Sequence, residues 1–240
     1  MNTTERKILT LIEDKKEYIF FFVISLLGFF IRIWGINSIS GDMQYCLLPW
    51  YNAIKSGGGF GALGKQVGDY GFPYQFIIAV MTYIPINPLY LYKILSIVFD
   101  YLLAFFCARF VCALKKENSN YLFCIVYSIV LFLPTVIMNS SLWGQCDSIY
   151  TTFIFIALYF LCREKYKTSF FFFGIGFAFK LQTVFIIPFL LYYYVRQKKY
   201  SILHFFIMLV AFITEWLYRV NMKRHQKRIF ELRREIEEIK

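Results

Sequence analysis

Long apolar stretches alternate along this chain with short clusters of lysine and arginine, and no other feature restricts the fold as much. The first stretch, 18–36, has about the 20 residues that an α-helix needs to cross a hydrocarbon core roughly 30 Å thick. It lacks a small-residue cleavage site, which favours a retained anchor over a signal peptide. The chain is 59% hydrophobic and 22% aromatic, richer than ordinary soluble domains. We therefore expect an all-α, polytopic membrane helical bundle.

The basic clusters predict how the helices are oriented. They occupy 6–16, 115–116, 163–167 and 196–199, and the positive-inside rule places all four on the cytoplasmic side. An even number of crossings must then separate successive clusters, which predicts about six or seven transmembrane helices. The net charge of +11 lies mostly in these clusters, so we expect the lipid bilayer as a partner and no nucleic acid.

Three regions follow from this pattern. Residues 1–17 are expected to be a cytoplasmic amphipathic N-terminus, and 18–200 a membrane module. Within the module, 37–87 form a long outer loop that carries an interfacial helix (43–55) and a short re-entrant helix (72–85). Residues 201–240 are expected to be a last apolar helix that continues into a charged tail. In that tail a coiled-coil-like spacing indicates a homo-oligomer or a partner protein; it is formed by Ile229, Leu232, Ile236 and Ile239.

A hairpin is expected between the third and fourth basic clusters, with its turn near Lys180-Leu181-Gln182. Each arm has only about 12 residues, or roughly 18 Å, so the turn should lie within the membrane. A charged side chain at that depth costs about 2.5–3.5 kcal/mol, which favours an anionic partner or ligand for Lys180. The alternative is a lysine that snorkels from an ordinary helix end.

Candidate site residues gather on the outer side in this topology. Asp42 follows a Ser-Gly turn, and the polar joint 139–147 connects two expected spans, 121–138 and 149–161, beside it. A catalytic role and a helix N-cap role explain Asp42 equally well. For Asp69 and Asp147, too, the N-cap role is the structural alternative. For other polar residues a structural role competes too: Trp143 could belong to an aromatic belt, Arg32 could snorkel, and Lys93 and Asp100 share one helix face that packs into the bundle.

Carboxylates beside a recessed cation suit a reaction between a hydroxyl and a lipid-linked phosphate ester. A carboxylate that accepts the hydroxyl proton typically accelerates such a step by about 10²–10⁴-fold. A cation stabilises the phosphate that leaves.

Five short motifs occur in an order that resembles the GT-C glycosyltransferases. They are Gly41-Asp42-Met43-Gln44, Asp69-Tyr70-Gly71-Phe72-Pro73, the span that contains Asp100, Trp143-Gly144-Gln145-Cys146-Asp147 and Phe179-Lys180-Leu181-Gln182. The chain is most similar in these motifs to the glucosyltransferases of N-glycan assembly and to bacterial relatives of the second mannosyltransferase of GPI-anchor synthesis. The resemblance covers 18 to about 200. It implies transfer of a hexose from a polyprenyl-phosphate carrier to a hydroxyl of a glycan or lipid, with inversion, on the outer or lumenal face.

The resemblance also implies roles for single residues. Asp42 would be the general base, and Lys180 and Gln182, together with Arg32, would bind the donor phosphate. The sugar or acceptor site would contain Asp69, Tyr70, Trp143, Gln145 and Asp147. Some members of the family need a divalent cation, Mg²⁺ or Mn²⁺, but the six cysteines and two histidines form no clear ligand set.

The C-terminus departs from the family pattern. GT-C enzymes usually continue with further spans, whereas 202–218 is the last apolar segment here. The competing interpretation is therefore a truncated or catalytically incomplete module that acts as a scaffold or subunit and needs a partner. The expected location is a multi-pass position in a bacterial cytoplasmic membrane with the site facing outside, or in the ER membrane of a eukaryote.

Overall fold

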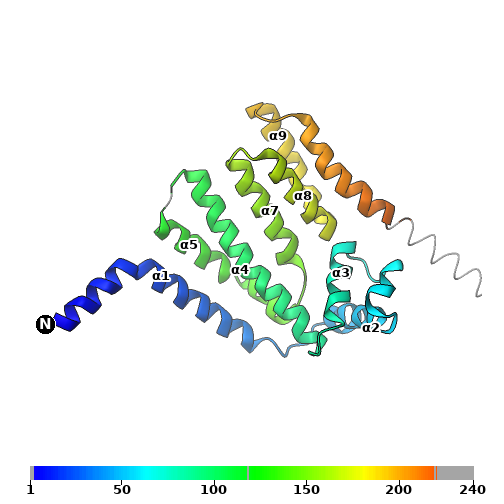
Figure 1. Cartoon of the computed structure of the whole chain (residues 1–240), viewed down its shortest axis with the longest axis horizontal. Coiled ribbons are helices and arrows are strands. Elements are labelled where there is room, and N and C mark those ends of the chain that lie inside the picture. The colour runs from blue at the N-terminus through cyan, green and yellow to red at the C-terminus, as the bar shows by residue number, and fades with distance from the viewer. Residues whose placement is uncertain (1–2, 118, 219, 221–240) are drawn as a thin grey trace, which may run out of the picture.

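The computed structural model describes residues 3–117, 119–218 and 220, and within these ranges it contains helices and no strand (Figure 1). The all-α prediction is thus confirmed. The elements in chain order are α1 (Thr3–Trp34), η1 (Met43–Leu47), α2 (Leu48–Ser56), η2 (Gly59–Gly64), α3 (Phe72–Met81), α4 (Pro88–Lys115), α5 (Asn120–Leu131), α6 (Pro134–Ile137), η3 (Met138–Trp143), α7 (Asp147–Cys162), α8 (Tyr166–Phe179), η4 (Leu181–Ile186), α9 (Ile187–Gln197) and η5 (Ile202–His204). The last apolar helix, Ile202–Tyr218, is called the C-terminal helix below.

The described residues contain fewer helices of membrane-spanning length than the six or seven expected. Among the described residues, two helices are long and apolar enough to cross a membrane, Glu13–Trp34 and Pro88–Lys115. A third is reached if the bent pair Asn120–Leu131 and Pro134–Trp143 is one span. The helices α7, α8 and α9 have 16, 14 and 11 residues, or about 16–24 Å at 1.5 Å per residue, which is less than a hydrocarbon core.

A proline breaks the helix that the sequence pattern placed over 121–138. α5 ends at Leu131, α6 begins at Pro134, and their axes differ by 55°. Pro134 has no N–H to donate and disfavours helical backbone at the residue before it, which agrees with the extended ψ of 124° at Leu133. The bend turns η3 toward α4, where the polar joint packs.

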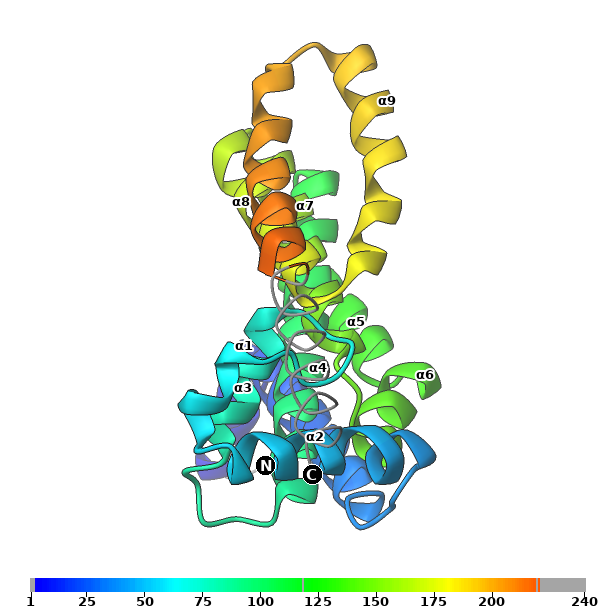
Figure 2. The ribbon, with the colours of Figure 1, turned by 90° about the vertical axis from the view of Figure 1, so that its right-hand side faces the viewer.

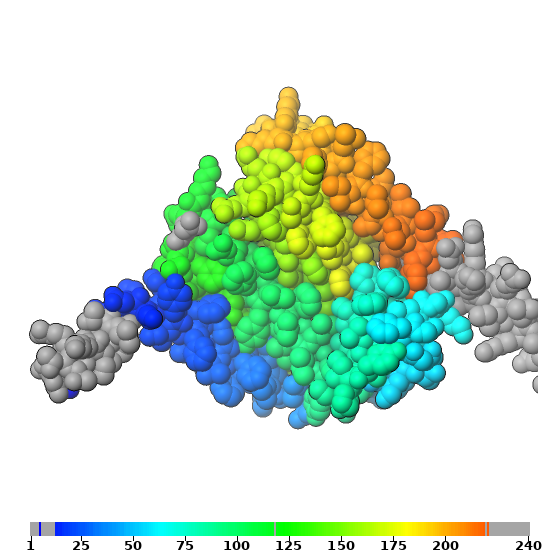
Figure 3. Space-filling view, viewed as in Figure 1, coloured from blue at the N-terminus to red at the C-terminus, as the bar shows by residue number. Residues whose placement is uncertain are grey.

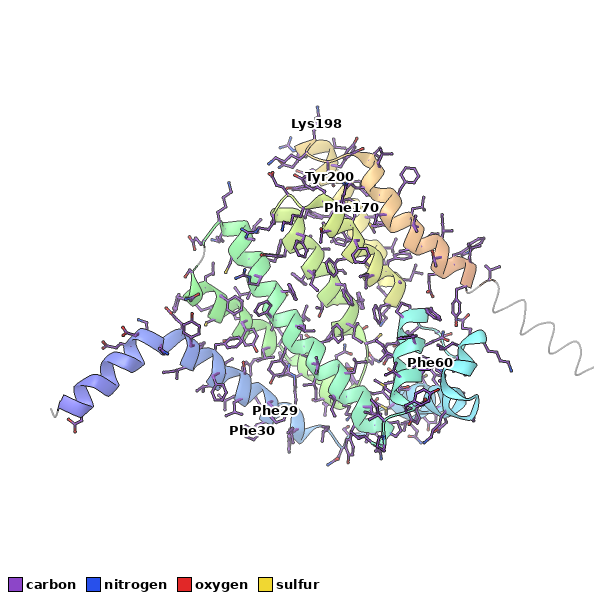
Figure 4. The ribbon with its side chains drawn as sticks, in the orientation of Figure 1. Phe29, Phe30, Phe60, Phe170, Lys198 and Tyr200 are labelled. Atoms are coloured by element: carbon purple, nitrogen blue, oxygen red, sulfur yellow. The ribbon has the colours of Figure 1, made fainter. Side chains whose placement is uncertain are left out.

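The bundle is built around α4, which packs between α5 and α7, while α8 packs on the other side of α7 (Figure 1). α1 runs along α5 and continues from the N-terminal residues into the first apolar stretch without a break. Phe29 and Phe30 point away from the bundle and are 46% and 59% exposed (Figure 4). So large an apolar face suits contact with lipid better than contact with water.

Three of the four basic clusters meet at one end of the bundle. Lys199 Nζ lies 2.7 Å from Glu164 Oε1 and joins the last two clusters, and Lys116 adds a favourable charge interaction with Glu164. Helices α2 and α3 lie at the opposite end (Figure 1). The grouping expected from the charges is therefore present, and it separates the basic loops from the outer loop.

The hairpin breaks where the sequence predicted. α8 ends at Phe179, Lys180 is extended with φ −150° and ψ 131°, and η4 begins at Leu181. The following segments return to the basic end, and the C-terminal helix then runs back along α8 toward α3 (Figure 2). The predicted seam at 229–239 lies outside the described residues.

The outer loop folds as an amphipathic helix followed by a second short one. Leu47, Tyr51 and Ile54 are buried along η1 and α2, whereas polar residues of the same helix are exposed. α3 starts at Phe72, as expected for the second helix, but ends at Met81. The space-filling view shows this part of the chain directly beside the C-terminal helix (Figure 3), and the Tyr218 hydroxyl donates to the carbonyl of Leu63 at 3.2 Å.

Candidate functional site

One face of α4 holds the segments that carry the site. Lys93 Nζ donates to three backbone carbonyls, those of Gly35 (3.0 Å), Ser38 (2.5 Å) and Ser141 (2.7 Å). One turn further, Ser96 Oγ donates to the carbonyl of Gln145 at 2.7 Å. Because an ammonium has three N–H donors, Lys93 is fully satisfied by backbone. Its role is to fasten the end of α1 and the polar joint to α4.

Arg32 and Asp100 form a second fixed point, and both side chains are fully buried. Arg32 Nε donates to Asp100 Oδ2 at 2.7 Å, and Ser140 and Ser148 each donate a hydroxyl to Asp100 at 2.5 Å. Arg32 also donates to the carbonyls of Gly28 and Leu131. The structure therefore does not bring Arg32 to Lys180 and Gln182, with which the sequence analysis grouped it.

Asp42 is exposed at the start of η1, and its carboxylate does not cap the helix. Ser40 takes that position instead, since the backbone N–H of Met43 donates to Ser40 Oγ at 3.1 Å. The Asp42 carboxylate accepts a hydrogen bond from Gln145 Nε2. The N-cap explanation for Asp42 is thus removed, and the carboxylate is oriented by the polar joint.

Gly144 makes this contact sterically feasible. It has a φ of 67°, which side-chain-bearing residues rarely adopt, and a Cβ there would lie 2.5 Å from Met43 Cε. The glycine thus allows the joint to turn directly after Trp143 and to approach η1 closely. Ser40 Oγ adds a hydrogen bond to the carbonyl of Trp143 at 3.2 Å.

Lys180 has the anionic partner that was expected from its predicted position within the membrane. Its ammonium is paired with Asp147 Oδ1 and lies over the rings of Tyr70 and Tyr150, at 5.3 and 5.6 Å from their centroids. The side chains of Lys180 and Asp147 remain 14% and 34% exposed. Asp147 occupies the first turn of α7 without capping it. This pair is accessible, unlike the pair inside the bundle.

Two neighbouring groups stay protonated beside this pair. Burial raises the pKa of the Cys146 thiol to about 12, although Lys180 lowers it. Burial also raises the pKa of Tyr70 far above its usual range, and the charges of Cys146, Asp147 and Asp42 add to the effect. The Tyr70 hydroxyl therefore remains a hydrogen-bond donor at physiological pH.

Two shallow cavities adjoin at Trp143. The first, of about 270 Å³, is lined by Ser40, Gly41, Asp42, Trp143 and Gln145. The second, of about 320 Å³, lies between α4, α6 and α7 and includes Asp147 and Trp143. Trp143 thus lines both the cavity that contains Asp42 and the cavity that contains Asp147.

Asp69 and Gln182 are exposed, and neither takes part in the polar contacts of Asp42 or Lys180 described above. Asp69 does not cap α3, because the N–H of Phe72 donates to Glu215 Oε2 at 3.1 Å. Gly71 brings the loop against α8: a Cβ there would lie 1.8 Å from the carbonyl oxygen of Ala178. The loop end is thus held between α8 and the C-terminal helix.

Sequence reasoning missed Ser40 and Glu215. Ser40 precedes Met43 by three residues, the spacing of an N-cap, and could have been weighed against Asp42. Glu215 is the single acidic residue of the apolar segment 202–218, which is itself a signal of a specific partner. Tyr150, which faces Lys180, had no such signal.

The acidic side chains do not converge as metal ligands. Across the described ranges no three His, Cys, Asp or Glu residues come together in a metal-binding group. Asp42 contacts Gln145, and Asp147 contacts Lys180. The described acidic side chains therefore supply no ligand set of three for the Mg²⁺ or Mn²⁺ that some GT-C enzymes need. No family model, curated protein or solved structure matches the chain.

Proposed function

We propose that this chain is a multi-pass membrane glycosyltransferase that moves a hexose from a polyprenyl-phosphate carrier to a hydroxyl acceptor, with Asp42 as the general base. The observation that carries the proposal is the state of Asp42. Its carboxylate is exposed in a cavity, is oriented by Gln145, and leaves helix capping to Ser40. A carboxylate held in this way, without a structural task, is suited to accept a proton from a bound hydroxyl.

The proposed reaction is a single displacement. Asp42 accepts the acceptor's hydroxyl proton while the hydroxyl oxygen forms a bond to the anomeric carbon of the hexose. The bond between that carbon and the phosphate oxygen breaks, and the lipid phosphate leaves with the electron pair. The acceptor oxygen enters opposite the leaving phosphate, so the configuration at the anomeric carbon inverts.

Lys180 is the cation proposed to stabilise the leaving phosphate. It remains partly exposed beside Tyr70, and Gln182 is exposed in the adjoining turn. A phosphate ester that enters this region adds a second anion to the ammonium already paired with Asp147. Preorganised charge of this kind typically contributes about 10²–10³-fold to a rate.

The location proposed for the site is the outer or lumenal face of the membrane. The basic loops at the opposite end of the bundle support this orientation, because such loops favour the cytoplasmic side. Two or three long apolar helices and the exposed apolar face of α1 support the membrane assignment.

An incomplete module is the second candidate, and the small volume of the Asp42 cavity favours it. Only five residues line this cavity of about 270 Å³, which is below the range of roughly 300–1,000 Å³ typical of small-molecule sites. In this alternative a partner protein covers the cavity and completes the binding site, and the chain by itself does not turn over.

A transfer assay with Asp42→Asn tests the proposal. The full chain in lipid nanodiscs receives radiolabelled polyprenyl-phosphate glucose or mannose with lipid and glycan acceptors. We expect transfer by the unaltered protein and a loss of about 10²–10⁴-fold in Asp42→Asn, because the amide does not accept the proton. Asp14→Asn is the matched control, since Asp14 is an exposed carboxylate of α1.

The outcomes separate the two candidates. Equal turnover in Asp42→Asn and the unaltered protein would refute the role of Asp42. Absence of transfer with every donor, followed by transfer after a membrane extract is added, would favour the incomplete module.

A further inference from the structure

Five of the eight residues that line the second cavity at Trp143, the one that contains Asp147, have polar side chains. Besides Trp143, it contains Thr135, Asn139, Asp147, Ser148 and Thr151, with Leu103 and Val136 as its apolar part. Its volume of about 320 Å³ falls at the lower end of the roughly 300–1,000 Å³ typical of small-molecule sites. Three hydroxyls, an amide and a carboxylate on neighbouring helices indicate a ligand that presents several hydroxyls.

Several of these groups have hydrogen-bonding capacity left. Within the described part of the chain, the Asn139 side-chain amide makes no hydrogen bond, although the residue is only 8% exposed. Asp147 uses Oδ1 for Lys180, and its second oxygen accepts no hydrogen bond from a described residue. Thr151 and Ser148 each donate their hydroxyl, to the carbonyl of Asp147 and to Asp100, and retain oxygen lone pairs.

Trp143 supplies the complementary apolar surface. Trp143 is 42% exposed and lines both this cavity and the one that holds Asp42. A pyranose ring has one face of C–H groups, which packs on an aromatic ring, and a rim of hydroxyls, which require donors and acceptors around them. An alkyl chain would cover the Asn139 amide and the second oxygen of Asp147 without giving either a hydrogen bond, at a cost in free energy.

We propose that this cavity binds one pyranose unit of a saccharide ligand, stacked on Trp143 and hydrogen-bonded by Asn139, Asp147 and Thr151. With the proposed function as its basis, the inference further assigns the acceptor to the saccharides rather than to simple lipid alcohols. Another hydroxyl of the same saccharide reaches past Trp143 into the cavity of Asp42, and the Asp42 carboxylate accepts its proton there.

A third cavity, beside the C-terminal helix, differs from the cavity at Trp143 because its lining is apolar. It has a volume of about 410 Å³ and is lined by residues such as Phe177, Leu181, Phe206 and Phe212, without a charged or amide side chain. A chain-like apolar molecule would fit that lining. The two cavities thus differ in chemistry, and a sugar ring suits only the one at Trp143.

Direct binding tests the inference without catalysis. Saturation-transfer NMR on the full chain in nanodiscs measures the affinity for methyl glucopyranoside, methyl mannopyranoside and maltose. Thr151→Val removes one hydroxyl and keeps the side-chain shape, and we expect about fivefold weaker binding, as for one lost hydrogen bond. Thr135→Val is a second variant on the exposed rim, where folding is least affected.

Thr214→Val is the matched control. Thr214 Oγ1 donates to the carbonyl of Val210 at 2.8 Å, and Thr151 Oγ1 donates to the carbonyl of Asp147 at 2.7 Å, so each threonine bonds four residues back. Weaker binding in Thr151→Val and Thr135→Val with unchanged binding in Thr214→Val supports the inference. Equal affinity in all four proteins, or an equal loss in all three variants, overturns it.

The result is separable from the transfer assay. If no donor is turned over but the variants weaken saccharide binding, the proposed function fails and the saccharide site stands. If Asp42→Asn abolishes transfer while Thr151→Val and Thr135→Val leave the affinity for saccharide unchanged, the function stands and this site is wrong.

Discussion

Two ion pairs in this molecule have the same chemistry and different surroundings. Arg32 and Asp100 are completely buried, and serine hydroxyls and backbone carbonyls satisfy their remaining groups. Lys180 and Asp147 are 14% and 34% exposed, have tyrosine rings beside them, and border a cavity.

The difference indicates which charges are available to a ligand. A buried pair whose hydrogen bonds are all internal has no capacity for a further partner, and removal of one member leaves an uncompensated charge. A partly exposed pair can exchange or share its partner with an entering ligand at a smaller cost. Charge alone would have assigned Arg32 and Lys180 the same role, and burial separates them.

The largest expected effect is on the buried pair. Asp100→Leu leaves the Arg32 guanidinium buried without its carboxylate, so we expect the free energy of unfolding to fall by about 3–5 kcal/mol. Denaturant titration of the detergent-solubilised protein measures this. In Arg32→Met with Asp100→Leu both charges are absent, and much of the loss should be recovered. A single variant as stable as the unaltered protein would contradict the structural role.

Lys180→Met should affect transfer more than stability. We expect transfer to fall by about 10²–10³-fold, because the leaving phosphate loses its cation, while the melting temperature changes little. Lys167→Met is the control, since Lys167 is an exposed lysine on the same hairpin, at the basic end. If Lys180→Met destabilises the protein as much as Asp100→Leu does, the two pairs share one role and the comparison fails.

The smallest effect is expected for the exposed pair Glu164 and Lys199, whose side chains are 62% and 50% exposed. The hydrogen bond and charge of Lys199 lower the pKa of Glu164, so any stability from the pair is present above the ordinary glutamate pKa and fades as the pH falls. Glu164→Gln should melt like the unaltered protein at about 0.15 M salt, where exposed pairs are screened. At low salt a slight difference at pH 7 should vanish by about pH 3. A large difference at pH 3 would contradict this assignment.

Local features of the fold were predictable from the sequence. The helix break at Lys180 follows from a charged residue and glutamine inside an apolar run, and the amphipathic helix after Asp42 follows from its spacing. The number of long helices was not, because the expected span 121–138 is bent by 55° at Pro134 and the expected span 149–161 falls in α7, which has only 16 residues. A pattern of hydropathy measures how apolar a segment is and says little about its axis.

Long-range polar contacts account for the remaining differences in the site. Arg32 finds Asp100 68 residues away, and Gln145 reaches Asp42 across 103 residues. The basic loops predict that Gln145 and Asp42 lie on the same side of the membrane, so their contact was partly anticipated. The contact between Arg32 and Asp100 depends on the rotation of α1 against α4. Rotation of packed helices is determined by side-chain fit, which a single sequence does not display.

The hydrogen bond from Phe72 to Glu215 also has a consequence for biosynthesis. The acceptor is made 143 residues after the donor, so at translation rates of about 5–20 residues per second the ribosome needs roughly 7–30 s to supply it. Until then the backbone N–H of Phe72 has no Glu215 carboxylate to donate to, because the C-terminal helix has not yet been made. The end of the bundle that holds α2 and α3 is therefore completed only after the C-terminal helix has been translated.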